Sequence, residues 1–412
     1  MKRSSRVSRR RFVGTSLGLP AAGAALAQSP QPLHAASRFS TASVYQRLGV
    51  RPFINAYGTS TPLSGTLMAP EVTKAMVEAS HNFVMLDDLQ EKVGKRLAEL
   101  TGAEAAFVTT GASAALCLAT CAVTAGDDPE KMKRLPDLTG MKSEIVIQKA
   151  HRNPNDHAFR MVGVKLIEAE TADEIRRAIT NKTAAVAMVL SHNSLGHQVK
   201  LEQMIAIAHQ AGVPLILDAA AEIPPPENLK RFVPMGADLV AFSGGKNLRG
   251  PQPSGILTGR KDLIAKAYAN SCPRDYFARI AKVGKEEIIG LLAAVELYLS
   301  QDHAAQRREY HAKLNRISEH LRGVPTLFTE LAPNDDYSHS PRLCIQWDEA
   351  KLGVTLDQMM SRLWEGEPAI YATDMRKYRP HWKGLGIFPY NLLPGEEMII
   401  ARRVRRILTP AG

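Results

Sequence analysis

Short apolar runs alternate with helical patterns along most of the chain. From residue 71 onward, the apolar runs predict strands at residues 105–109, 143–148, 164–169, 184–190, 214–218, 237–242 and 254–260. Between them, apolar residues three or four apart predict helices at residues 89–100, 114–123, 172–179 and 201–210. Strands that are apolar throughout and separated by helices favour a mostly parallel sheet covered on both faces. We therefore predict an α/β fold with helices on both faces of such a sheet.

The last third of the chain follows a different pattern. Residues 282–321 form a long helical stretch that is expected to contain more than one helix. Beyond it, the pattern predicts strands at residues 342–347 and 369–372 and helices at residues 356–363 and 395–408. This order predicts a smaller α+β domain at the C-terminal end. Residues 127–141 interrupt the first pattern with charges and prolines, and we expect a surface insertion there.

Residues 1–27 show the order of an export signal. Basic residues precede a short apolar run that ends in Ala25-Leu26-Ala27, and they include the string Ser8-Arg9-Arg10-Arg11-Phe12-Val13. This string is similar to the twin-arginine motif, so we expect a periplasmic or otherwise exported protein. The run is too short and too rich in Gly and Ala for a stable membrane span. A disordered basic tail is the alternative.

These patterns divide the chain into five parts. We predict a twin-arginine signal peptide at residues 1–27, a linker rich in Pro, Ser and Ala at 28–43, and an N-terminal segment at 44–70. A large cofactor-binding domain follows at residues 71–281. The helical connection and the small C-terminal domain occupy residues 282–412.

Composition and charge exclude some classes of function. The 412 residues are 45% hydrophobic and 23% charged, which is typical of a globular protein with a large core. Removing the six basic residues of segment 1–27 from the net charge of +11 leaves +5, and aromatic residues are few. We therefore expect no nucleic-acid partner. Cys117 and Cys121 lie four apart on one predicted helix, which favours packed thiols, and no Cys/His spacing suggests a metal.

Lys246 lies in a glycine-rich loop between two predicted core strands. It follows Ser243-Gly244-Gly245 and precedes Gly250-Pro251-Gln252. Lysine is usually a solvated surface residue, but a tight loop between core strands does not place it for solvation. A lysine amine that burial keeps neutral is a nucleophile. We predict that Lys246 binds pyridoxal 5'-phosphate (PLP) as a Schiff base, and an exposed loop lysine is the alternative.

Asp218 ends the apolar strand predicted at residues 214–218. A buried carboxylate needs a partner, because burying an unpaired charge is costly. The protonated pyridine nitrogen of PLP is such a partner, and the pair keeps the ring cationic and able to accept electrons from the α-carbon of a substrate. A helix N-cap or a surface-turn aspartate is the alternative.

Small residues after one strand predict a phosphate site. Gly111, Ala112 and Ser113 open a helix, where backbone N–H groups and the helix dipole favour an anion. The hydroxyl of Ser243 can donate to the same phosphate. An ordinary small-residue turn is the alternative, since many connections between a strand and a helix have this composition.

Two further residues complete the predicted site. His151 follows a strand and could stack on the pyridine ring, with a structural turn histidine as the alternative, and Asn193 could donate to the phenolic oxygen of PLP. In parallel sheets, ligands bind beyond the carboxyl ends of the strands. Because Gly111, His151, Asn193, Asp218 and Lys246 all end or follow predicted strands, we expect them to form one site.

At these positions the chain resembles the fold-type-I PLP enzymes. Within that group it is most similar to the SelA-like branch, which comprises L-seryl-tRNA selenium transferase and D-glucosaminate-6-phosphate ammonia-lyase. The resemblance runs from about residue 44 to the C-terminus and rests on the motifs Gly245-Lys246-x-Leu248-x-Gly250-Pro251-Gln252, His151-Arg152-Asn153 and Val50-x-Pro52-x-Ile54-Asn55-Ala56-x-Gly58-Thr59.

The resemblance implies a role for each site residue. Lys246 would bind the cofactor covalently, Asp218 would lie under the pyridine nitrogen, and His151 would lie on the ring. The phosphate would be bound by Gly111, Ala112, Ser113 and Ser243. A homodimer or higher homo-oligomer is also implied. The predicted export signal stands where selenium transferases carry a tRNA-binding domain.

We therefore predict an exported PLP enzyme that acts on a small amino acid or amino sugar. Lys246 would abstract the α-proton, followed by β-elimination of the ammonia-lyase type or by racemisation. A selenium transferase and a non-catalytic PLP-binding fold are the alternatives. The sequence does not choose among the arginines that could bind a substrate carboxylate or phosphate, which are Arg51, Arg249, Arg342, Arg376 and Arg379.

Overall fold

The computed structural model describes residues 43–192, 199–332, 340–377 and 382–409. The chain divides into two units, residues 1–52 and 53–412. In the first unit, Ser43 caps the N-terminus of helix α1 (Val44–Leu48), and its Oγ accepts from the Gln46 backbone N at 3.2 Å. The predicted signal peptide, and all of the predicted linker except Ser43, lie outside the described residues. The predicted boundaries at residues 70 and 281 stay predictions, because both fall inside the second unit.

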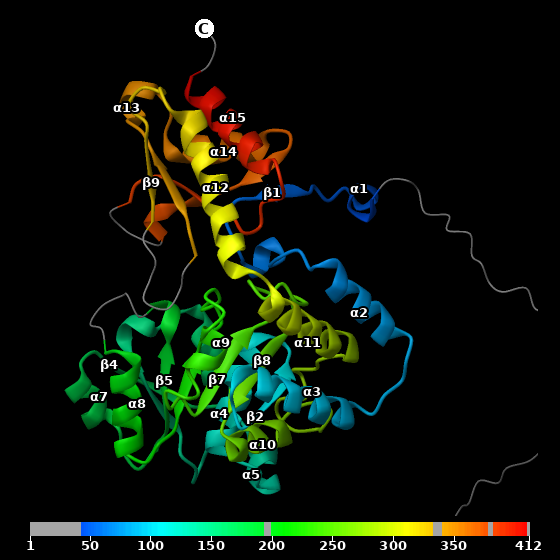
Figure 1. Cartoon of the computed structure of the whole chain (residues 1–412). Coiled ribbons are helices and arrows are strands. Elements are labelled where there is room, and N and C mark those ends of the chain that lie inside the picture. The colour runs from blue at the N-terminus through cyan, green and yellow to red at the C-terminus, as the bar shows by residue number, and fades with distance from the viewer. Residues whose placement is uncertain (1–42, 193–198, 333–339, 378–381, 410–412) are drawn as a thin grey trace, which may run out of the picture. The chain divides into compact units, whose positions relative to one another are not determined.

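A seven-stranded sheet organises the second unit (Figure 1). In spatial order its strands are β2 (Ala105–Thr109), β8 (Gly255–Gly259), β7 (Leu239–Ser243), β6 (Leu215–Asp218), β5 (Thr183–Val189), β3 (Glu144–Gln148) and β4 (Lys165–Ala169). The five strands from β7 to β4 pair in parallel, while β8 is antiparallel to both of its neighbours. The predicted mostly parallel sheet is confirmed.

Alternate residues of each strand enter two apolar cores, which explains why the strands are apolar throughout. In β6, Leu215 and Leu217 face one core and Ile216 faces the other. The first core is built with helices α3 (Leu86–Thr101), α7 (Ala172–Ala178), α8 (Leu201–Gln210), α9 (Asn228–Arg231) and α11 (Lys285–Ser300). The second is built with α4 (Gly111–Thr124), α5 (Pro129–Arg134), α6 (His157–Arg160) and α10 (Lys261–Ala269). Helices therefore cover both faces, as predicted.

The surface insertion predicted at residues 127–141 is partly wrong. This segment contains helix α5, and Met132, Leu135 and Leu138 are buried in the second core. Charged residues are frequent in this segment, but its apolar side chains are buried in the second core. The segment is therefore exposed on its polar side and buried on its apolar side.

The C-terminal part of the second unit has its own sheet, as predicted. Its antiparallel strands, in spatial order, are β12 (Thr373–Asp374), β13 (Leu385–Ile387), β10 (Leu343–Gln346) and β9 (Phe328–Leu331). The helices of this part are α12 (His303–Leu321), α13 (Glu349–Leu352), α14 (Leu356–Glu365) and α15 (Glu396–Leu408), and α12, α14 and α15 enclose a third apolar core.

Two N-terminal segments of the second unit join these parts. Strand β1 (Phe53–Asn55) pairs in parallel with β11 (Ala369–Tyr371), and helix α2 (Pro70–Ser80) packs against α11. The stretch between β1 and α2 is thereby held close to both the large sheet and the C-terminal part. This position matters for the site described below.

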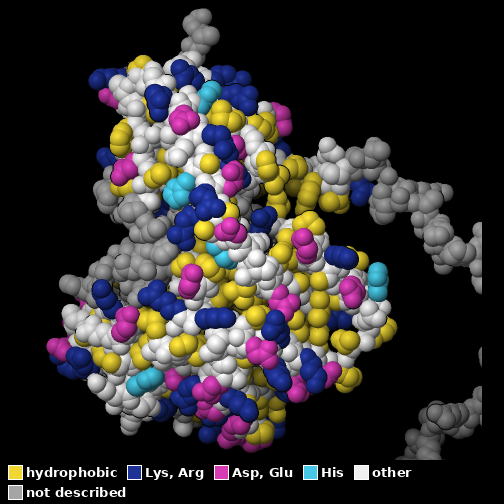
Figure 2. Space-filling view, viewed as in Figure 1, with side chains coloured by type: hydrophobic (Ala, Val, Ile, Leu, Met, Phe, Trp, Pro, Cys, Tyr) yellow, Lys and Arg dark blue, Asp and Glu magenta, His cyan; other side chains and the backbone are white. Residues whose placement is uncertain are grey.

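The surface is of mixed charge. On the face shown in Figure 2, side chains of Lys and Arg are interspersed with those of Asp and Glu. None of the helices in the described ranges is long and apolar enough to cross a bilayer. All four cysteines are buried and free, which agrees with the prediction of packed thiols.

Candidate active site

A cavity of about 760 Å³ lies at the carboxyl ends of β2, β5, β6 and β7. Most of the predicted site residues line it, namely Gly111, Ala112, Ser113, Asp218, Ser243 and Lys246. They come from three separate segments of the chain. The structure therefore brings together the residues that the strand-end argument grouped into one site.

The turn at the start of α4 has the geometry of an anion site. Gly111 has φ +83°, and the N-terminal N–H groups of α4 that follow have no partner within the helix. The hydroxyl of Thr109 donates to the Gly111 carbonyl at 2.9 Å and fixes the turn. Strand β8 passes so close that a Cβ on Gly255 would lie 2.5 Å from the Gly111 carbonyl carbon and 2.8 Å from the Ala112 N. Glycine at 255 is therefore required for this turn.

The loop that carries Lys246 is packed just as tightly. A Cβ on Gly244 would lie 2.1 Å from the Ser254 Oγ, and a Cβ on Gly245 would lie 2.6 Å from the Gln252 Cα. The two glycines therefore let the loop fold directly onto the residues that precede β8. Lys246 follows them, and its side chain lines the cavity.

Asp218 is the last residue of β6 and lies between Val189 of β5 and Ala241 of β7. It is partly buried, and its Oδ1 accepts a hydrogen bond from the Ala220 N at 3.0 Å. The turn thus fixes the carboxylate at the edge of the sheet while the side chain lines the cavity. Asp218 can therefore stabilise the turn through its Oδ1 and still be available to bind the cofactor.

His151 lies in the 3-10 turn η2 (Lys149–His151) and is 1% exposed. The Val189 N donates to its Nδ1 at 3.3 Å, and the Gln148 Nε2 lies 3.4 Å from its Nε2. It is absent from the described residues that line the cavity, while its neighbours Asn153 and Asn155 line it. Stacking of His151 on the cofactor ring stays a prediction.

Asn193 lies outside the described residues, so its predicted bond to the cofactor stays a prediction as well.

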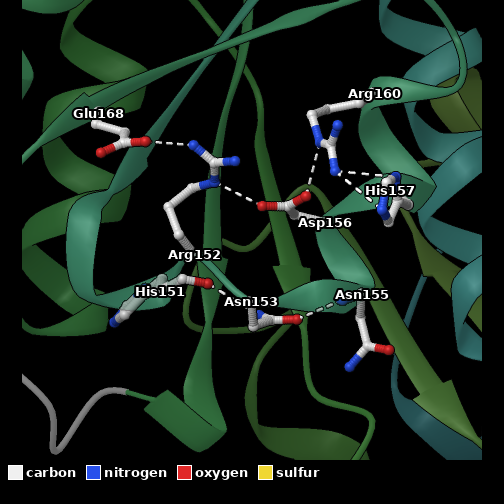
Figure 3. A network of polar contacts seen from close by, with 8 residues as sticks. All are labelled: His151, Arg152, Asn153, Asn155, Asp156, His157, Arg160 and Glu168. Carbon is white, nitrogen blue, oxygen red and sulfur yellow. Dashed lines mark hydrogen bonds and ion pairs between the residues drawn. The ribbon is translucent and has the colours of Figure 1, made fainter.

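An ion-pair network holds the segment that follows His151 (Figure 3). The Asp156 side chain is 4% exposed, and its carboxylate contacts the Arg152 Nε at 2.5 Å and the Arg160 Nε at 2.8 Å. Arg152 also pairs with Glu168 on β4. Burial by itself raises the pKa of Asp156, but the bonds from Arg152 and Arg160 outweigh it and hold that pKa below its usual value.

The sequence-based analysis did not identify several residues of the cavity. Thr59, Ser60, Thr61 and Pro62 line it from the stretch between β1 and α2. That stretch is tied to the Lys246 loop, because the Thr66 hydroxyl donates to the Lys246 carbonyl at 3.0 Å and the Gln252 Nε2 donates to the Thr61 carbonyl at 2.9 Å. The small and polar residues of this stretch are the sequence feature that points to it, because such segments often line sites.

Three of the candidate arginines, Arg249, Arg342 and Arg376, are absent from the described lining of the cavity. The Arg249 Nε donates to the Leu67 carbonyl at 2.9 Å, Arg342 is buried with its guanidinium 5.8 Å from the Phe388 ring centroid, and Arg376 pairs with Asp374. No arginine is among the described residues that line the cavity. Arg51 belongs to the first unit, and Arg379 lies outside the described residues. A clamp for the substrate is therefore not assigned among them.

The residues present fit PLP. The cavity has the size of a cofactor site, a backbone turn at its wall can bind a phosphate, and one carboxylate and one lysine meet there. Together with the seven-stranded, mostly parallel sheet and the small C-terminal sheet, this site defines a fold-type-I PLP-dependent enzyme.

Comparison with known proteins identifies the family. The model of the family described as "SelA: L-seryl-tRNA selenium transferase" matches residues 54–325, and the chain belongs to this family. D-glucosaminate-6-phosphate ammonia lyase of Salmonella typhimurium is 33% identical over 382 residues, which cover 90% of this chain and 100% of the relative. The solved structure of a D-glucosaminate-6-phosphate ammonia-lyase is 32% identical, with a TM-score of 0.77, over 90% of this chain and 99% of that chain.

A second relative carries a different name. The 5'-C-glycyluridine monooxygenase-decarboxylase of a Streptomyces species is 34% identical over 382 residues, which cover 89% of this chain and 92% of the relative. The chain is thus a PLP-dependent enzyme of the SelA-like group, as predicted.

Proposed function

We propose that the protein is a PLP-dependent lyase that acts on a small amino acid or amino sugar acid. It would abstract the α-proton and then eliminate a substituent from the β-carbon. The observation that carries this proposal is the single cavity in which Lys246, Asp218 and the turn at residues 111–113 meet. The similarity to D-glucosaminate-6-phosphate ammonia lyase supports elimination over racemisation.

Each residue has a role that its position allows. PLP, when bound, supplies an electron sink that stabilises negative charge at the α-carbon of the substrate. Lys246 would hold the cofactor through its Nζ, and once free its amine would take the α-proton. Asp218 would accept a hydrogen bond from the protonated pyridine nitrogen. The hydroxyl of Ser243 and the N–H groups at residues 111–113 would bind the phosphate.

The lining of the cavity favours a hydroxylated substrate and hence elimination. Apart from Asp218 and Lys246, the described polar lining consists of hydroxyls and carboxamides, such as Thr61, Ser191 and Gln252. A substrate with a hydroxyl on its β-carbon would lose water after α-proton removal. Hydrolysis of the resulting imine would consume one water and release ammonia and a 2-oxo acid. The products therefore distinguish this reaction from racemisation.

Incubation in heavy water tests the proposal. The full chain, loaded with PLP, is mixed with D- and L-amino acids and with glucosaminate, free and phosphorylated. We expect loss of the α-proton NMR signal of one substrate class together with ammonia release. Exchange with inversion and no ammonia would indicate a racemase, and oxygen uptake would indicate the chemistry that the Streptomyces relative's name describes. No exchange with any compound would refute the proposal.

A lysine variant ties the result to the site. We expect Lys246→Ala to lose at least about a thousandfold in turnover, because it removes both the attachment and the base. Borohydride treatment should fix the cofactor to the wild-type protein and not to the variant. Fixation at another lysine would overturn the assignment of Lys246.

We also propose that the protein is exported through the twin-arginine route. The support is the string at residues 8–13 followed by an apolar run and Ala25-Leu26-Ala27. A reporter fused behind residues 1–43 should reach the periplasm of a bacterial host. Substituting both Arg9 and Arg10 by Lys should keep the reporter inside the cell.

A homodimer is proposed on the resemblance to fold-type-I enzymes. Sedimentation of the PLP-loaded protein should give about twice the mass of one chain. A stable, active monomer would contradict this.

A further inference from the structure

Asn155 occupies an unusual place in the structure. It lies in the 3-10 turn η3 (Pro154–Asp156), its side chain is exposed, and it lines the 760 Å³ cavity. It also lines a second cavity of about 530 Å³, whose other walls include Cys117, Met161 and Phe277. Asn155 and Ser113 belong to both cavities. A substrate group that reaches from the first cavity toward the second would therefore lie near Ser113 and Asn155.

The carboxamide of Asn155 has its bonding capacity available. The Asn155 backbone N donates to the Asn153 Oδ1 at 2.8 Å, and the Asn153 Nδ2 donates to the His151 carbonyl at 2.9 Å. The Asn155 side-chain amide itself makes no hydrogen bond to any residue in the described ranges, and in Figure 3 it points away from the ion-pair network. A carboxamide offers two donor hydrogens and one acceptor oxygen.

The same turn is held rigidly on its other side. Asp156, the next residue, is clamped by Arg152 and Arg160 and is 4% exposed at its side chain. Arg152 is tied in addition to Glu168 of the neighbouring strand. These contacts restrict the backbone on which Asn155 is mounted. A polar group positioned in this way can discriminate between ligands, because little freedom is lost when it binds.

We propose that Asn155 is a specificity-determining residue that binds a hydroxyl group on the side chain of the substrate. Asp156 is its positioning residue. This inference rests on the proposed function in that it takes the same cavity as the substrate site. A neutral group that donates and accepts matches a hydroxyl, which does the same. The substrate class is therefore an amino acid with one or more side-chain hydroxyls.

Binding measurements on matched ligands test this inference. The probes are both enantiomers of serine against alanine and of homoserine against 2-aminobutyrate. Calorimetry on the PLP-loaded full chain gives the dissociation constants of ligands that are not turned over, and the concentration dependence of ammonia release gives the KM of those that are. For at least one pair, we expect the wild type to bind the hydroxylated member about tenfold more tightly, which is the effect of one well-placed hydrogen bond.

In Asn155→Ala, we expect that preference to fall to within about twofold, through weaker binding of the hydroxylated member alone. The absorbance of the bound cofactor should not change. Asn181→Ala serves as the matched control, because Asn181 is an exposed asparagine that lines neither cavity. Equal binding of both members of every pair by the wild type, including no binding, would overturn the inference. So would equal weakening of both members in Asn155→Ala.

Asp156→Asn tests the positioning role separately. We expect it to reduce the preference for the hydroxylated member while the deoxy member binds as before. A drop in thermal stability with the preference intact would show that Asp156 is only structural. A failure of the proposed function alone would look different. The wild type would then still prefer the hydroxylated ligand but would cause no loss of the α-proton signal in heavy water.

Discussion

Replacing Gly255 by Ala probes the turn at residues 111–113, which we propose binds the cofactor phosphate, without changing a side chain of the site. The new Cβ would lie 2.5 Å from the Gly111 carbonyl carbon and 2.8 Å from the Ala112 N. Carbon atoms in contact prefer separations of about 3.5–4.0 Å. Because the neighbours are backbone atoms at the start of α4, no side chain can rotate to make room. The turn must therefore move away from β8 by about 1 Å.

The size of the effect follows from that displacement. Hydrogen bonds from backbone N–H groups hold over a donor–acceptor range of only about 0.5 Å, so a shift of about 1 Å breaks or weakens those that reach the phosphate. Hydrogen bonds to a charged group contribute about 1.5–3 kcal/mol each. Loss of one such bond predicts about 10- to 100-fold weaker PLP binding. Overpacking should also lower the free energy of unfolding by about 1–3 kcal/mol.

Titration of cofactor-free protein with PLP, followed by its visible absorbance, measures this change. Gly140→Ala is the control, because Gly140 has φ +78° and open space around its Cβ position. It should cost about 1 kcal/mol of stability through backbone strain and leave PLP affinity unchanged. A folded Gly255→Ala protein that binds PLP as tightly as the wild type would refute the assignment of the turn to the phosphate.

Three further outcomes follow from the structure. Asp218→Asn should keep the fold but lower turnover by about a hundredfold or more, measured at saturating substrate, and near-normal turnover would contradict its place at the pyridine nitrogen. The folded-state pKa of Asp156 is lowered, so its contribution to stability is present at neutral pH and is lost as the pH falls below about 4. Urea unfolding of Asp156→Asn should therefore show about 1–3 kcal/mol less stability at pH 7 and a smaller difference at pH 3. Burial, followed by the charges of Glu330 and Asp374, raises the pKa of Cys344 to about 12, so a thiol reagent at pH 8 should label it only after unfolding, and fast labelling of the native protein would show that it is accessible.

The core of the sheet could be predicted because its strands are encoded locally. The predicted strand at residues 105–109 coincides with β2, and the predicted helix at 201–210 coincides with α8. In both, the apolar pattern and the element have the same length. A strand buried on both faces needs an apolar residue at every position, and a helix buried on one stripe needs one every three or four residues. The predicted grouping of strand-end residues follows from the same regularity, because parallel strands place their carboxyl ends at one edge.

Short strands that pair with distant parts of the chain leave no such pattern in the sequence. Strand β1 has three residues and pairs with β11, more than 300 residues later in the chain. Strands β12 and β13 have two and three residues, too few for an alternation to show. Because β1 positions the stretch that follows it, the contribution of Thr59 and Thr61 to the cavity also depends on a contact that no local signal encodes.

The orientation of side chains after a strand is a separate problem, and His151 and Asn155 illustrate it. Both lie within the eight residues after β3, so their spacing places both near the carboxyl edge. Contacts made on folding decide which of them faces the cavity. The Val189 N of the adjacent strand donates to the His151 ring, and the ion pairs of Asp156 with Arg152 and Arg160, each four residues away, hold the turn that carries Asn155. His151 is predicted to stack on the cofactor ring because it follows a strand and because the resemblance to fold-type-I enzymes implies that role, and this stays a prediction. Of these two residues, Asn155 lines the cavity, and its proposed selectivity for hydroxylated ligands is therefore the sharper test of how this edge of the sheet recognises its substrate.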